Sequence, residues 1–215
     1  QWTWVITGVA SVVGLVLALG ADPIRLPMAG DGVADVLSVN DLDDYRRLRE
    51  RLDRHPAMAG EPAAGGCRVL VIGAGLIGCE FANDLLGAGH QVSVVDPAAG
   101  PIAALLPSTA SEALRRALAS QGVSWLFGDV VLRVDKEGSA YSVLLRSGIC
   151  LQVDLVLSAV GLKPRTALAA LAGLAVGRGI QVDSQLRSSD PDIFAVGDCA
   201  EIDGHTARLF AGNGI

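Results

Sequence analysis

The residues with the clearest chemistry are three glycines at a fixed spacing. Residues 73–78 read Gly-Ala-Gly-Leu-Ile-Gly and fit the pattern G-x-G-x-x-G, which holds the pyrophosphate of a dinucleotide where a strand turns into a helix. Gly73 permits the tight turn, Gly75 lets the pyrophosphate approach the backbone, and Gly78 lets the helix pack closely against the strand. The N–H groups at the start of the helix would then face the phosphates. The candidate cofactor-binding residues of this segment are Gly73, Ala74, Gly75, Leu76, Ile77 and Gly78.

The elements around these glycines have the order that the motif needs. Residues 68–72 form a continuous apolar run, typical of a buried parallel strand, and a helix is expected over residues 76–86. A second strand over residues 91–95 ends in Asp96, whose carboxylate can accept hydrogen bonds from the adenosine ribose and would repel a 2′-phosphate. NADH is therefore expected to be preferred over NADPH. The alternative is that the glycines only form a tight turn. The apolar residues at helical spacing are Ile77, Phe81 and Leu85.

Few other side chains have a spacing that signals chemistry. Glu80 lies in the first turns of the expected helix, where a carboxylate is common and mildly stabilising. The three histidines are isolated, so no metal site is expected, and Cys79 is expected to be a small packing residue. The four cysteines form no C-x-x-C pair, which argues against a redox dithiol and fits a reducing cytoplasm.

The rest of the chain also alternates between strands and helices. A turn is expected over residues 20–23, and Ser38 and Asp41 have capping-box-like spacing before a helix over residues 41–53. An antiparallel meander over residues 129–153 precedes a buried strand that is closed by Gly161. The other expected elements are a helix over 111–120 and strands over 123–127, 154–160, 179–183 and 192–196.

Charge and hydropathy restrict the class of protein. The net charge is −6 and Lys and Arg form no long run, so nucleic-acid binding is not expected. Residues 1–21 carry no charge, and a stretch of about twenty apolar residues is long enough to span a bilayer as a helix. The alternative is a pair of buried strands, Trp4–Ile6 and Leu15–Leu19, which the glycines and β-branched residues favour.

Four segments together resemble a known family. Residues 67–84, which contain the glycine motif, look like the NADH-binding segment of the rubredoxin reductases, which belong to the flavoprotein reductases with two dinucleotide-binding units. Residues 157–166 are similar to the strand and turn where such a chain returns to its FAD domain. Residues 193–200 are similar to the second FAD motif, and residues 15–23 resemble the strand before the crossover into the NADH domain.

The resemblance implies cofactors, further site residues and partners. Asp198 would bind the ribityl chain of FAD, and Glu80 would lie near the contact between flavin and nicotinamide. Gly161 and Gly197 become candidate cofactor residues on the same grounds. NADH would give a hydride to FAD, and electrons would pass on to a rubredoxin or a ferredoxin-like protein. The cofactors carry this chemistry, so no side chain is named as catalytic.

The resemblance also implies a fold and a domain division. The expected fold is α/β, with a Rossmann-type parallel sheet, a β-meander crossover and flanking partial FAD-domain segments. Residues 1–58 would form a partial FAD-domain segment and a connecting helix, residues 59–162 the NADH-binding Rossmann domain, and residues 163–215 a partial return segment of the FAD domain.

One departure from the family concerns the flavin. The chain has one G-x-G-x-x-G unit where the family has two, and it resembles a member with both ends cut away. The isolated chain is therefore expected to purify without tightly bound FAD. A non-catalytic NAD-binding module is the main alternative, and a membrane-tethered protein is the other.

Overall fold

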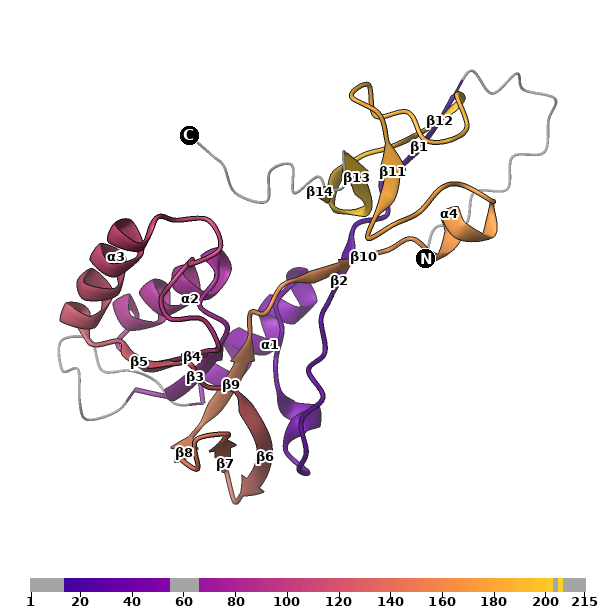
Figure 1. The fold of residues 1–215 in the computed structure, drawn as a ribbon. Helices are drawn as coiled ribbons and strands as arrows, with labels where there is room; N and C mark the ends of the chain where they lie inside the picture. The colour runs from indigo at the N-terminus through magenta and orange to yellow at the C-terminus, as the bar shows by residue number, and fades with distance from the viewer. Residues whose placement is uncertain (1–13, 55–65, 203–204, 207–215) are drawn as a thin grey trace. The chain divides into compact units, whose positions relative to one another are not determined.

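The computed structural model describes residues 14–54, 66–202 and 205–206 (Figure 1). The chain divides into two compact units. One is Pro23–Gly161, and the other joins Gln1–Asp22 to Leu162–Ile215. We describe each unit by itself. The expected boundary between residues 58 and 59 lies outside the described residues.

A parallel sheet forms the centre of the unit Pro23–Gly161. Its strands follow the order β5 (Ser124–Phe127), β4 (Gln91–Asp96), β3 (Arg68–Ile72) and β9 (Leu155–Ser158). All neighbouring strands are parallel, and Val71 of β3 lies opposite Val94 on one side and Leu157 on the other. This is the doubly wound order expected for a dinucleotide-binding domain, and it confirms the predicted Rossmann-type sheet.

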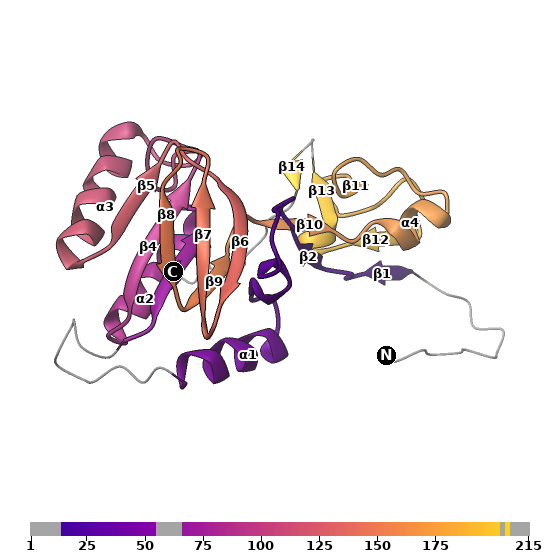
Figure 2. The ribbon, with the colours of Figure 1, turned by 90° about the horizontal axis from the view of Figure 1, so that it is seen from below.

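Two different layers cover the faces of this sheet (Figure 2). Val69 and Val71 of β3 pack in a cluster with helices α2 (Leu76–Gly87) and α3 (Ser108–Gln121). Leu70 and Ile72 pack in a second cluster with the three-stranded antiparallel sheet. The strands of that sheet are β6 (Val131–Glu137), β7 (Ala140–Leu145) and β8 (Cys150–Val153), and they confirm the predicted meander. Burial on both faces explains why β3 is apolar at consecutive positions rather than at alternate ones.

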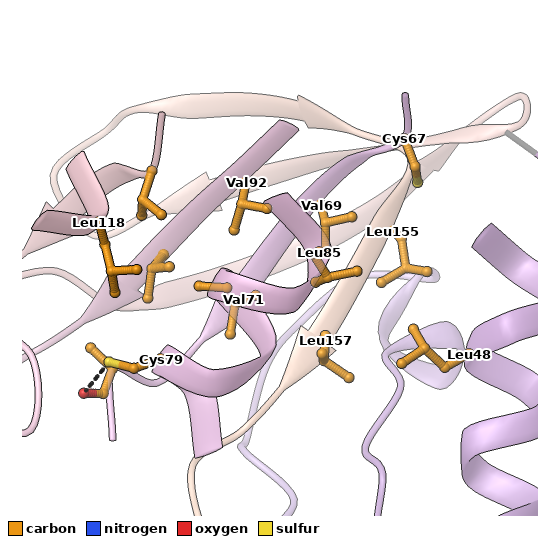
Figure 3. Packing of buried hydrophobic residues seen from close by; sticks show 14 of the residues in the cluster. Leu48, Cys67, Val69, Val71, Cys79, Leu85, Val92, Leu118, Leu155 and Leu157 are labelled. Carbon is orange, nitrogen blue, oxygen red and sulfur yellow. Dashed lines mark hydrogen bonds between the residues drawn. The ribbon is translucent and has the colours of Figure 1, made fainter. Parts of the chain in front are cut away.

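Small side chains bring α2 close to the sheet (Figure 3). The helix buries Gly78, Cys79, Ala82 and Leu85, whereas Ile77 is 39% exposed. The apolar spacing of the sequence pointed to a face containing Ile77, and that interpretation was wrong. The reason is that a helix in close contact with a strand buries its smallest residues, while Ile77 lies on the first turn beside the open end of the glycine motif. Cys79 is a packing residue, as predicted.

Helix α1 (Leu42–Leu52) packs its C-terminal half on the same core. Leu48 and Leu52 are buried, while Leu42 and Tyr45 are exposed. The N-cap is Asp41, whose carboxylate accepts a hydrogen bond from the N–H of Asp44 at 2.8 Å. Asp44 in turn accepts one from the N–H of Asn40 at 3.1 Å. The cap therefore lies three residues later than the predicted pairing of Ser38 with Asp41, and Asp44 accepts from Asn40 rather than from the N-cap residue itself. A short 3₁₀ helix, η1 (Val33–Asp35), precedes α1 in the chain.

The second unit is built from short strands. Strand β1 (Leu15–Leu17) is parallel to β12 (Ile193–Ala195), and β2 (Ala21–Pro23) pairs with β10 (Leu162–Pro164). The predicted turn over residues 20–23 is thus a strand that follows Gly20, which has φ +70°. The remaining elements are α4 (Ala167–Leu171), β11 (Ile180–Val182), η2 (Gly197–Cys199), β13 (Ala200–Ile202) and β14 (His205–Thr206).

The uncharged N-terminal stretch lies partly outside the described residues. The predicted strand Trp4–Ile6 falls in residues 1–13, which the structure does not describe. Leu15–Leu19 is partly strand, because β1 covers Leu15–Leu17. Among the residues that are described, no helix has the length and apolar character needed to cross a bilayer.

The two candidate caps of α1 make a test of local stability. Asp41→Ala should lower the free energy of unfolding by about 1 kcal/mol, because the N–H of Asp44 loses its acceptor. Ser38→Ala should be neutral or stabilising, since the Ser38 hydroxyl is buried and has no hydrogen-bond partner. Urea unfolding of both variants measures the difference, and equal losses would contradict the assignment of the cap.

Candidate functional site

The glycine motif joins the end of β3 to the start of α2, and two of its glycines are required by close contacts. Gly73 has φ +104°, and a Cβ there would lie 2.7 Å from the carbonyl oxygen of Ala159. A Cβ on Gly78 would overlap the carbonyl oxygen of Gly73. Both positions therefore exclude a side chain unless the backbone shifts.

Gly75 is different, because it faces open space. No atom lies within 4 Å of the position that its Cβ would occupy, and Gly75, Leu76 and Ile77 are all exposed. The first N–H groups of any α-helix lack intrahelical partners. Gly75 is the N-cap of α2 and has no side chain that could accept hydrogen bonds from them. An anion can approach this end of α2 and accept hydrogen bonds from its backbone.

Asp96 lies beside the turn because β4 is the neighbour of β3. One carboxylate oxygen, Oδ2, accepts a hydrogen bond from the N–H of Ala74 at 2.6 Å. The other oxygen, Oδ1, accepts one from the N–H of Ala98 at 2.7 Å. The side chain is half-buried, and a carboxylate that accepts two hydrogen bonds keeps further acceptor capacity for ribose hydroxyls.

Sequence reasoning missed the segment that follows Asp96. The N–H of Ile102 donates to the carbonyl oxygen of Ala74 at 2.7 Å, and Ile102 has φ +51°, which is rare for a β-branched residue. The hydroxyl of Ser111 on α3 donates to the carbonyl oxygen of Pro101 at 2.6 Å and holds the segment from the other side. The Gly100-Pro101 pair is the sequence signal for this segment. It predicts a turn, but it does not predict that Ile102 contacts Ala74.

Cys79 and Glu80 are the other reactive side chains near the turn. Burial raises the pKa of the Cys79 thiol to about 11, with smaller contributions from Asp96 and Glu80, so this residue is a neutral thiol at pH 7. Its sulfur contacts the carbonyl oxygen of Ala74 at 3.5 Å. Glu80 is exposed on α2. Within the described part of the chain, no three His, Cys, Asp or Glu side chains are grouped as metal ligands.

The other predicted site residues are Gly161, Gly197 and Asp198. Gly161 has φ +105°, and its carbonyl oxygen accepts a hydrogen bond from the N–H of Ile24 at 3.1 Å. Gly197 has φ +73° and directly follows Val196 at the end of β12, with no atom close to its missing Cβ. Asp198 is half-buried in η2, and its carboxylate accepts no hydrogen bond from the described residues.

A hollow of about 370 Å³ lies elsewhere on the unit Pro23–Gly161, between the end of β5 and the turn that joins β7 to β8. None of the predicted cofactor residues lines it. The glycine turn is an exposed surface at a helix end rather than a cavity, so the hollow does not argue against it. The lining residues are Trp125, Leu126, Phe127, Gly128, Asp129, Arg146, Ser147 and Ile149.

Comparison with known proteins identifies the family. Residues 11–211 match the sequence profile described as pyridine nucleotide-disulphide oxidoreductase. The chain belongs to this family. The family match therefore covers the glycine motif, Asp96 and the segment around Asp198.

Individual members of this oxidoreductase family are similar over most of the chain. The rubredoxin-NAD(+) reductase of Acinetobacter baylyi is 45% identical over 88% of the chain, and that of Alcanivorax borkumensis is 46% identical over 89%. The crystal structure of a ferredoxin reductase from Rhodopseudomonas palustris matches with a TM-score of 0.78 and 35% identity, over 89% of this chain and 45% of that one. The chain spans 47% of the length of each rubredoxin-NAD(+) reductase.

The close contact at Gly73 can be tested against another glycine of the same unit. Gly73→Ala should destabilise the unit by about 2 kcal/mol, because alanine is strained at φ +104° and meets the Ala159 carbonyl oxygen. Gly87→Ala, at the exposed end of α2 with no atom within 4 Å, should be stabilising by about 0.5 kcal/mol. Thermal unfolding distinguishes the two, and a neutral Gly73→Ala would contradict the geometry.

Proposed function

We propose that the chain binds NADH at the turn between β3 and α2 and forms the NADH-binding half of an FAD-dependent NADH reductase. The observation that carries the proposal is the combination of an open Gly75 at the N-terminus of α2 with the Asp96 carboxylate at the end of the neighbouring strand. The first feature suits a pyrophosphate and the second a ribose with free hydroxyls.

The chain's own residues bind and orient the nucleotide in this proposal. N–H groups of the first turn of α2 would donate to the pyrophosphate, and Asp96 would accept hydrogen bonds from the adenosine ribose. Glu80, exposed on the same helix, is the proposed residue near the nicotinamide. Bound FAD would supply the acceptor for the hydride of NADH and the one-electron chemistry that follows. The described residues need no general acid or base for this step.

The second unit is proposed to hold part of the FAD. The carboxylate of Asp198 is half-buried and free of hydrogen bonds to the described residues, so it can accept them from the ribityl hydroxyls. Gly197, with positive φ, is proposed to let the flavin approach the backbone of this unit. Gly161, the last residue of the unit Pro23–Gly161, is proposed as a cofactor residue separately, on its own positive φ. Two rubredoxin-NAD(+) reductases and a ferredoxin reductase are similar to this chain, which supports the reductase role of the whole protein.

The acceptor in this proposal is a rubredoxin or a ferredoxin-type protein, as the names of these relatives indicate. A cytoplasmic location is proposed because the four cysteines are free thiols. The competing function is an NAD-binding module without catalysis. FAD binding that depends on Asp198, even if weak, separates the two, because a module that binds only NAD would not contact a flavin through this residue.

NADH should bind more tightly than NADPH, by about tenfold or more, because the 2′-phosphate would meet the Asp96 carboxylate. Asp96→Arg should narrow or reverse the preference. Isothermal titration calorimetry of the 215-residue chain with each nucleotide measures the dissociation constants of NADH and NADPH. Equal affinities in the unaltered chain would remove Asp96 from this role, and no binding of NADH at all would overturn the proposed function.

Asp198→Ala should weaken FAD binding by about tenfold, because the ribityl chain loses a charged acceptor. Asp192→Ala is the matched control, since Asp192 is an exposed acid next to β12 in the same unit. Quenching of flavin fluorescence on titration with the protein gives the affinity. An equal effect of the two substitutions would contradict a specific contact between Asp198 and the flavin.

A further inference from the structure

Both backbone groups of Ala74 are held by one segment of chain, residues 96–102. The Asp96 carboxylate accepts the N–H of Ala74 at 2.6 Å, and the N–H of Ile102 donates to its carbonyl oxygen at 2.7 Å. Ala74 is the residue between Gly73 and Gly75 of the glycine turn. Segment 96–102 therefore touches the turn at its centre, on two opposite groups.

These two hydrogen bonds orient two successive peptide planes. A trans peptide is planar, and its N–H and C=O point in opposite directions; the described chain contains no cis peptide. Holding the N–H of Ala74 fixes the plane shared with Gly73, and holding the carbonyl of Ala74 fixes the plane shared with Gly75. The N–H of Gly75 lies in this second plane, so its direction follows from the contacts that hold the carbonyl of Ala74, which are the N–H of Ile102 at 2.7 Å and the Cys79 thiol at 3.5 Å.

The turn needs such support because its own residues provide little. Gly73 and Gly75 have no side chains to restrict their φ and ψ angles, and an unconstrained glycine samples a wide range of both. The supporting segment is itself well anchored. Ser111 holds the carbonyl of Pro101, which is buried, and Ile102 remains at φ +51° despite its β-branched side chain. A disfavoured conformation of this kind persists only where surrounding contacts determine it.

We propose that Asp96 is a positioning residue for the pyrophosphate turn, in addition to any contact with the adenosine ribose. By accepting the N–H of Ala74, its carboxylate fixes the peptide plane between Gly73 and Ala74. Together with the Ile102 contact that orients the next plane, it keeps the turn in the conformation that presents the N–H of Gly75 and the first N–H groups of α2. This inference rests on the proposed binding of NADH. It differs from a ribose contact because it acts on any ligand with a pyrophosphate, whether or not the ribose hydroxyls are present.

A nucleotide without those hydroxyls separates the two roles. The probe is the NADH analogue whose adenosine is 2′,3′-dideoxy, compared with NADH by isothermal titration calorimetry. Asp96→Ala removes both acceptor oxygens. Asp96→Asn keeps the size of the side chain, but its one carbonyl oxygen can accept only one of the N–H groups of Ala74 and Ala98. Asp84→Ala, an exposed acid on α2, is the matched control.

The positioning role predicts that Asp96→Ala and Asp96→Asn each weaken binding of the dideoxy analogue by about fivefold or more, while Asp84→Ala has no effect. This change is smaller than the full loss of a hydrogen bond to a charged group would cause. A ribose contact alone predicts no change for the analogue. Repulsion between the carboxylate and the pyrophosphate alone predicts tighter binding after either substitution. If either substitution left binding of the analogue unchanged or made it tighter, the inference would be overturned, while the binding of NADH would remain established. If the unaltered chain bound neither nucleotide, the proposed function would fail, and this role with it.

Hydrogen exchange of the Ala74 amide gives a second readout in the absence of nucleotide. The amide should be protected in the unaltered chain and in Asp84→Ala, and exchange at least about tenfold faster in Asp96→Ala, because that substitution removes its acceptor. Far-ultraviolet circular dichroism confirms that each variant is folded. If Asp96→Ala does not fold, Asp96→Val, which also lacks an acceptor oxygen, carries the test. Unchanged exchange at Ala74 in a folded variant without an acceptor at position 96 would overturn the positioning role.

Discussion

The burial of β3 on both faces is the constraint on which the rest of the Rossmann unit depends. Val69 and Val71 must be covered by helices, and Leu70 and Ile72 by the meander, because the strand is apolar at every one of these positions. The parallel order of the sheet agrees with this burial, because parallel sheets occur almost only where both faces are covered. The close packing of α2 that follows is possible only because Gly78 and Ala82 lack bulk. The dinucleotide turn is thus a product of how β3 is buried.

The position of the turn explains why so few side chains define the candidate site. At the carboxyl end of a parallel sheet, neighbouring strands deliver their last residues to one edge. β3 brings the glycines there, β4 brings Asp96, and the segment after β4 returns to Ala74. The polar contacts at this edge are mostly with backbone groups. Their geometry is therefore set by the fold more than by the chemistry of individual side chains.

Much of the Rossmann unit could be predicted because its signals are local. Strand β3 was predicted with its observed bounds, and α2 and β4 were each predicted to within one residue. The errors arose where contacts between residues distant in the sequence decide which side chains are buried and which segments pair. Ser38 has the residue type of a cap but is buried away from the start of α1, and Ile77 has helical spacing but lies on the exposed side of α2. Residues 20–23 contain turn residues, yet they pair with β10.

The sequence by itself determined the glycine pattern, the strand before it, the helix after it and the acid at the end of the next strand, because each of these depends on residues close together in the chain. Only the tertiary structure decided which groups Asp96 would hold. Its carboxylate contacts Ala74, 22 residues earlier, because β4 pairs in register with β3. Ile102 reaches the same residue in a left-handed conformation that its side chain disfavours. No local preference predicts that conformation, since long-range contacts impose it.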